Sequence, residues 1–193
     1  MKIKNFVLAS ALVLGGVMSA NAQKDEAFLG AKVGMNIASM TNSEGADPRI
    51  GLSVGVLGEY FITDMFAVQG EVLYSMQGNK HDVKGVTSTL KNDYLSIPVL
   101  AKVYPMMGQG FNIFAGPQFA FNVNASGKIS GLNIDVKDEV EPFDFGIALG
   151  LGYDAKCGFL VDARWTPSLT NTFKNNGVDS KNSVFTISVG YKF

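Results

Sequence analysis

Cysteine and histidine are almost absent from this sequence, and their scarcity excludes several kinds of site. Cys157 is the only cysteine, so the chain cannot form an internal disulfide bond. His81 is the only histidine, and no combination of cysteine and histidine has the spacing of metal ligands. We therefore predict no metal site and no cofactor, and we assign no catalytic residue.

Charged residues are also scarce, and neither sign dominates. Asp, Glu, Lys and Arg make up 17% of the chain, whereas a soluble domain usually covers its surface with Lys and Glu. When Lys2 and Lys4 are left out of the 16 basic residues, 14 remain against 17 acidic ones, a net charge near −3. A nucleic-acid partner calls for a basic stripe and is not expected.

Only the N-terminus carries a long apolar run. Lys2 and Lys4 precede an apolar stretch over residues 6–19, which is shorter than the roughly 20 residues needed to span a bilayer. Ala20 and Ala22 then form the small-x-small pattern that signal peptidase recognises. We predict a signal peptide at residues 1–22 and a single exported domain at residues 23–193.

What the chain has in abundance is a two-residue alternation of apolar with small or polar side chains. In the last ribbon, residues 185–193, the alternating apolar residues end with Tyr191 and Phe193. Successive side chains of a β-strand point to opposite faces, so each such ribbon predicts a strand with one apolar face. The seven earlier ribbons lie at residues 28–38, 50–61, 66–78, 93–104, 111–123, 143–153 and 159–165. Pro98 and Pro117 lie inside two of them and predict a bulge or a local break.

Long and short connections alternate between the ribbons. The long, polar ones lie at residues 39–49, 79–92, 124–142 and 167–183. The short ones lie at residues 62–65, 105–110 and 155–158. In an outer-membrane barrel, short turns face the periplasm and long loops face outward. The chain is therefore predicted to be an all-β protein, an eight-stranded antiparallel up-and-down transmembrane β-barrel in the cell outer membrane, with periplasmic termini.

A soluble, lipocalin-type barrel is the alternative with the same number of strands. Its polar face would point to solvent, and its apolar face would line a ligand cavity. Here the face opposite the apolar one consists mostly of Gly, Ala, Ser, Asn and Gln, which suit a narrow interior better than a solvent-exposed surface. Aromatic residues near the ribbon ends also favour a membrane barrel, in which they form girdles at the two interfaces.

A few charged residues lie on the face that we predict to point into the barrel. They are Lys32, Glu59, Glu71, Lys102, Asp162 and Arg164. Opposite charges joined by hydrogen bonds offset the cost of removing each from water, so we expect a packed network with Glu71 and Arg164 as a pair. An eight-stranded barrel is just wide enough for its own side chains, and an open pore is not expected. The network could serve as a scaffold or conduct protons or ions.

A series of short strings lies along the ribbons in a recognisable order. They are Gly34-Met35-Asn36, Gln69-Gly70-Glu71 with Leu73-Tyr74-Ser75, Tyr94-Leu95-Ser96-Ile97-Pro98, Gly116-Pro117, residues 146–152 and Asp162-Ala163-Arg164. In this order they resemble the PorT-like outer-membrane β-barrel family, often labelled porin-like. The resemblance implies a small barrel of the OmpX or OmpA type and a role in a protein-secretion machinery. The ending at Tyr191 and Phe193 resembles the C-terminal insertion signal of such barrels.

Three functions stay open at this point. A structural or partner-binding role is favoured, because long loops on a rigid barrel provide contact surfaces. A component of a PorT-like secretion assembly is the alternative. An outer-membrane lipid-modifying enzyme is a further one, in which His81 would act with Ser75 or Ser88, although nothing fixes these groups within hydrogen-bond reach. The expected partners are outer-membrane lipid, the barrel-insertion machinery, and secretion-complex or surface proteins.

Overall fold

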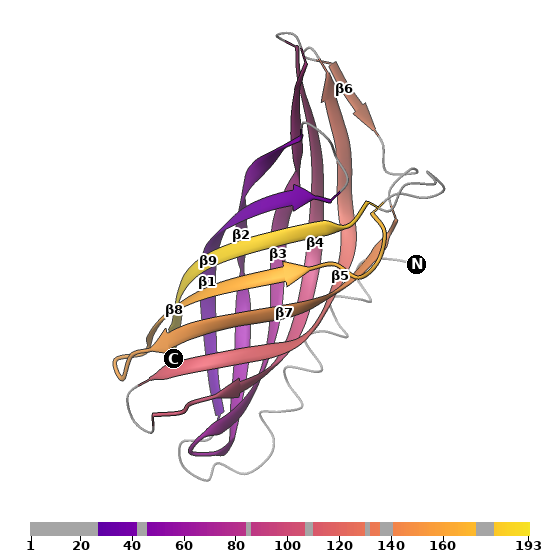
Figure 1. Cartoon of the computed structure of the whole chain (residues 1–193). Helices are drawn as coiled ribbons and strands as arrows, with labels where there is room; N and C mark the ends of the chain where they lie inside the picture. Colours follow the sequence, from indigo (N-terminus) through magenta and orange to yellow (C-terminus); the bar gives the residue numbers. More distant parts are fainter. Residues whose placement is uncertain are drawn as a thin grey trace, which may run out of the picture.

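The chain folds into a closed barrel of antiparallel strands (Figure 1). The computed structural model describes residues 27–41, 46–83, 86–106, 110–129, 132–135, 141–172 and 180–193. The predicted signal peptide, with Ala20 and Ala22, lies outside these residues. The strands are β1 (Ala27–Met40), β2 (Ala46–Thr63), β3 (Phe66–Val83), β4 (Val86–Val103), β5 (Phe111–Ile129), β6 (Leu132–Asp135), β7 (Phe143–Asp154), β8 (Phe159–Pro167) and β9 (Asn182–Lys192).

Eight of these strands make the barrel wall. They follow the order β4-β3-β2-β1-β9-β8-β7-β5, and β4 also pairs with β5, which closes the circle. The remaining strand, β6, pairs with the far end of β5 in the described part of the chain. The predicted eight-stranded antiparallel barrel is therefore confirmed. Within the described segments, no helix is long and apolar enough to cross a membrane.

The two faces of the wall differ as the alternation predicts. In β1, Leu29 and Val33 point outward with 41% and 43% of their surface exposed, whereas Lys32 and Asn36 point inward with 5% and 1% exposed. The same contrast runs around the barrel, with large apolar side chains outside and polar side chains buried inside. This is the reverse of a lipocalin, so the soluble alternative is wrong.

Several strands extend further than the sequence predicts. The predicted loop at residues 79–92 consists largely of strand, because β3 and β4 stay paired as far as Val83 and Val86. β5 likewise continues to Ile129 and pairs with β6 inside the predicted loop at residues 124–142. These extensions project beyond the rest of the barrel (Figure 1). The apolar–polar alternation in the sequence ends before the strands do, because a strand outside the membrane needs no apolar face. Its main-chain hydrogen bonds to the neighbouring strand continue unchanged.

The two prolines cause a local break without a bulge. Pro98 lies opposite Gln118, and pairing between β4 and β5 resumes at Ala101 and Ala115 in the same register. Pro117 lies opposite Ile147 with no register shift in the described β5–β7 pairing. Proline lacks an N–H but has a φ angle that an extended strand tolerates, so each ring interrupts the ladder without moving it.

The short turns gather at the end of the barrel where the C-terminus lies (Figure 1). Two of them contain glycines with positive φ, Gly110 at 78° and Gly158 at 93°. This region of φ favours glycine because a Cβ atom would be strained there. These turns set β4 against β5 and β7 against β8, and they bring Asp154 and Lys192 to the same end of the lumen.

Candidate functional site

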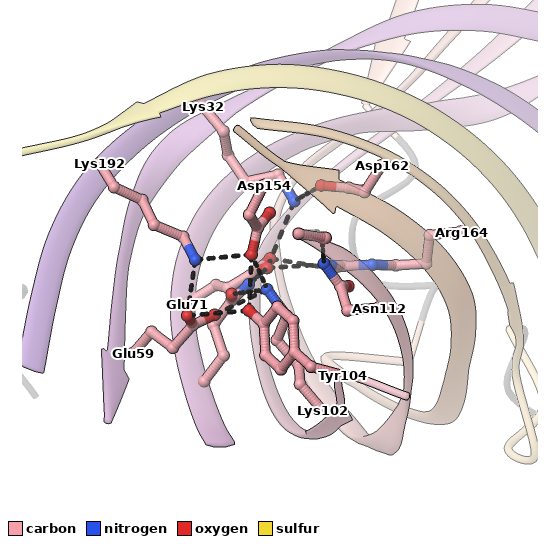
Figure 2. Close-up of polar contacts among 12 residues, drawn as sticks. Lys32, Glu59, Glu71, Lys102, Tyr104, Asn112, Asp154, Asp162, Arg164 and Lys192 are labelled. Atoms are coloured by element: carbon pink, nitrogen blue, oxygen red, sulfur yellow. Dashed lines mark hydrogen bonds and ion pairs between the residues drawn. The ribbon is translucent and has the colours of Figure 1, made fainter. Parts of the chain in front are cut away.

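Two clusters of oppositely charged side chains lie in the barrel lumen. The first cluster joins Lys32 of β1, Glu71 of β3, and Asp162 and Arg164 of β8 (Figure 2). Arg164 donates two hydrogen bonds to Glu71, from Nη2 to Oε1 at 2.7 Å and from Nη1 to Oε2 at 2.9 Å. Lys32 Nζ lies 2.5 Å from Asp162 Oδ2 and 3.3 Å from Glu71 Oε1. The structure thus brings four of the predicted lumenal charges together, with Glu71 and Arg164 in direct contact.

The second cluster holds the other two predicted charges, Glu59 of β2 and Lys102 of β4, together with Asp154 of β7 and Lys192 of β9. Lys102 Nζ lies 2.6 Å from Glu59 Oε2 and 2.9 Å from Asp154 Oδ2. Lys192 Nζ lies 2.6 Å from Glu59 Oε1 and 2.7 Å from Asp154 Oδ2. Each ammonium group therefore bridges both carboxylates.

Tyr104, which directly follows β4, completes the second cluster. Its hydroxyl group lies 2.6 Å from Asp154 Oδ2 and 3.0 Å from Glu59 Oε1. Because ionised carboxylates can only accept hydrogen bonds, the hydroxyl group is the donor in these contacts.

Gln69 of β3 connects the two clusters. Its Nε2 atom donates to Glu71 Oε1 at 2.5 Å, and its Oε1 atom accepts from Lys102 Nζ at 3.1 Å. The amide thus presents its donor to the anion of the first cluster and its acceptor to a cation of the second. Each cluster contains two cations and two anions, so the charges balance within each one.

The clusters are buried from solvent. The side chains of Glu59 and Glu71 are 0% exposed, and those of Lys32, Lys102 and Arg164 are almost as inaccessible. A complete buried ion pair contributes little net stability, but removal of one partner leaves a buried charge without compensation, at a cost of about 3–5 kcal/mol. The stability of each buried charge in the network therefore depends on the presence of its partners.

The sequence prediction missed Gln69, Tyr104, Asp154 and Lys192. Asp154 directly follows the predicted ribbon at residues 143–153 and so received no face, whereas Tyr104 is in phase with Lys102 but carries no charge. Gln69 and Lys192 do lie on the polar faces of their ribbons. Lys192 would have been found by extending the face rule to the end of its strand, and Gln69 by including uncharged polar residues.

Uncharged polar side chains fill the lumen next to the first cluster. Asn36 Nδ2 donates to Ser75 Oγ at 2.9 Å, and Thr186 Oγ1 donates to Asn36 Oδ1 at 2.8 Å. A cavity of about 20 Å³ remains between these residues and Arg164. That volume holds about one water molecule. The described lumen is therefore packed with side chains at this level.

The groups considered for an enzyme do not form one constellation in the described atoms. Ser75 Oγ is buried in the lumen, where it accepts hydrogen bonds from Asn36 and Gln77. The main chains of His81 and Ser88 are register partners in the projecting part of β3 and β4, and their side chains lie outside the described atoms. Within the described residues, no group of three His, Cys, Asp or Glu side chains could hold a metal ion.

Tyr191 and Phe193, the predicted insertion signal, lie at the short-turn end of the wall. Their ring centroids are 5.7 Å apart, and Tyr191 also contacts Phe159 at 5.2 Å. The main-chain N–H of Phe193 donates to the carbonyl group of Leu29 at 2.7 Å. The last residue therefore continues the pairing of β9 with β1.

Comparisons with known proteins agree with this architecture. Residues 21–174 match the family described as outer membrane protein beta-barrel domain. Comparison with curated proteins finds no match. Among solved structures, neisserial surface protein A is similar with a TM-score of 0.54 and 17% identity, over 86% of this chain and 97% of that chain. Ail, the attachment invasion locus protein of Yersinia pestis, is similar with a TM-score of 0.51 and 12% identity, over 89% of this chain and 100% of that chain.

At these identities the two solved structures show a shared fold. The family match, by contrast, spans most of the chain. Together with the closed barrel and its outward apolar face, it gives both family and location: this protein belongs to the outer membrane protein beta-barrel domain family and resides in the outer membrane.

Proposed function

We propose that this protein is a plugged outer-membrane barrel that serves as a structural or partner-binding component and not as a diffusion pore. The observation that carries the proposal is the continuous network from Asp162 through Lys32, Glu71, Gln69 and Lys102 to the second cluster. These side chains come from strands on different sides of the barrel, so their contacts cross the lumen (Figure 2). Because the charges balance within each cluster, neither cluster has a net charge that would attract a passing ion.

A liposome-swelling experiment tests the exclusion of solutes. Vesicles that contain the folded protein are diluted into isosmotic solutions of small sugars, and light scattering reports uptake. We expect no uptake above that of empty vesicles. Rapid swelling with the wild-type protein would contradict the proposal, provided that heat-modifiable gel migration shows the protein folded.

The same proposal includes an orientation. The short turns and both ends of the mature domain would face the periplasm, and the projecting parts of β3, β4 and β5 would face outward. Residues 1–22 would direct export, and Tyr191 and Phe193 would be read by the barrel-insertion machinery. Labelling of single cysteines in intact cells tests this: in a Cys157→Ser background, a cysteine at Asn133 should react with an impermeant maleimide, and one at Lys156 should not.

The projecting strands are the surface that we propose for partner binding. Their main-chain pairing continues well beyond the apolar wall. The paired strands would therefore form an ordered binding surface outside the membrane. A PorT-like secretion assembly, proposed from the resemblance of the local strings, would instead dock at the short turns. Photo-crosslinking from Asn133 and from Lys156 separates the two: capture at Asn133 supports an outer partner, and capture of a secretion component at Lys156 supports the assembly.

A further inference from the structure

A second cavity opens at the short-turn end of the barrel, next to the second cluster. Its volume is about 470 Å³, which lies within the roughly 300–1,000 Å³ typical of small-molecule sites. Phe28, Phe61, Tyr191 and Phe193 line its walls, and Asp154 lies where it meets the charged cluster. A plugged scaffold has no need of such a cavity.

Asp154 offers a hydrogen-bond acceptor toward this cavity. All three of its described side-chain contacts, from Lys102, Tyr104 and Lys192, go to the same oxygen, Oδ2. Among the described residues, no donor contacts Oδ1, and Figure 2 shows this oxygen without a dashed line. The side chain of Asp154 is 15% exposed, more than any other charged side chain of the cluster.

The walls also favour a cation. Lys192 Nζ already lies 5.9 Å from the centre of the Phe28 ring, and Lys102 Nζ lies 5.3 Å from that of Tyr104. The faces of aromatic rings attract ammonium groups, and quaternary ammonium ions are typical ligands of aromatic cages. Four charged residues line the cavity, namely Asp64, Asp154, Lys156 and Lys192. Both described ion pairs of Lys192 Nζ already go to carboxylates, and Lys156 is exposed to solvent, so a ligand next to the rings meets Asp154 first. Among the described residues, the unpaired Oδ1 of Asp154 and the ring faces are thus the two features that favour a cation in this cavity.

We propose that this cavity binds a small organic ammonium ion. The charged nitrogen would lie near Asp154 Oδ1, and its alkyl groups would contact the rings of Phe28, Phe61 and Tyr191. This goes beyond the plugged scaffold, because it adds a ligand at the mouth of the barrel that the lumenal network does not require.

NMR titration of the ¹⁵N-labelled protein in dodecyl maltoside, a detergent without an ammonium group, tests the proposal. Choline is the probe, and 3,3-dimethyl-1-butanol, which has nearly the same shape without the charge, is the matched control. We expect saturable shifts of the Asp154 and Tyr191 amides with choline and about ten-fold weaker binding of the alcohol. Equal binding of the two, or no saturable shift with choline, would overturn the proposal.

Variants and lipids sharpen the result. Asp154→Asn should weaken choline binding about ten-fold. Phe61→Leu is the second cavity variant, used if Asp154→Asn does not fold, and should weaken choline binding several-fold. Phe143→Leu, at the other end of the wall, is the control and should leave choline binding unchanged. Unchanged choline binding in both cavity variants would contradict the site.

Nanodiscs with and without phosphatidylethanolamine then identify the source of the ammonium group. Competition between this lipid and choline indicates a lipid headgroup, and the absence of competition indicates a soluble ammonium compound.

Discussion

Glu71 shows how single residues hold the lumen together. Arg164 contacts both of its carboxylate oxygens, and Lys32 and Gln69 contact one of them. A carboxylate with a 0% exposed side chain has no access to water, so its partners provide its entire stabilisation. Arg164 and Lys32 depend on Glu71 in the same way, because a neutral residue in its place would remove a carboxylate that compensates their buried charges.

Glu71→Gln is therefore expected to destabilise the barrel by about 3–5 kcal/mol, because it leaves buried cations without a compensating charge. Urea unfolding of the protein in lipid vesicles measures the change. Asp64→Asn makes the same chemical change at an exposed turn and should alter stability by no more than about 0.5 kcal/mol. Equal effects of the two variants on the free energy of unfolding would show that the buried cations do not need the negative charge of Glu71.

Two glycines on neighbouring strands should respond in opposite ways. A Cβ atom at Gly55 would come within 2.8 Å of the Leu73 Cα atom, whereas one at Gly70 would have no atom within 4 Å. We expect Gly55→Val to cost about 1–3 kcal/mol. Gly70→Val should be neutral or stabilise by up to about 1 kcal/mol, because valine favours strands and apolar surroundings. The same unfolding experiment would contradict this account if Gly70→Val were the more harmful variant.

At the scale of the strands, the sequence predicts most where the membrane imposes a pattern. Outward residues such as Val33 and Ile187 must be apolar in lipid and inward residues such as Ser188 are polar, so the alternation identifies every wall strand. It could not predict the projecting pairs, such as His81 with Ser88, because water on both sides imposes no alternation. Nor could the alternation predict that Asp154 lies beside Lys192. Strand tilt and shear determine which residues of different strands lie at the same level along the barrel axis, and the alternation defines neither of them.

The projecting hairpin should be dispensable for barrel folding. Gly78 and Lys91 are register partners, so an Asn-Gly turn in place of residues 79–90 would join β3 to β4 directly. We expect the shortened protein to fold, since the apolar wall and the lumenal clusters remain intact, and to show heat-modifiable gel migration. Loss of folding would mean that the projecting strands help to form the barrel and are not only an outer platform.

At the scale of the whole molecule, two features define the barrel. The lumen is crossed by charge-balanced clusters that leave a cavity of only about 20 Å³ beside Arg164. The short-turn mouth, in contrast, opens into about 470 Å³. Among the described residues, side chains thus fill the lumen beside Arg164, whereas the short-turn end is hollow. Whether the lumen is closed at this level decides whether solutes and ions cross the barrel.

Single-channel recording in planar bilayers shows whether ions cross the lumen. Folded wild-type protein is added to the bilayer in 1 M KCl, and its incorporation is checked independently by recovery from the membrane. We predict no stepwise conductance above the background of the bare bilayer, because the ion pairs that Glu71 makes with Arg164 and Lys32 lie across the lumen. Stable, ohmic conductance steps from the incorporated wild-type protein would contradict the account.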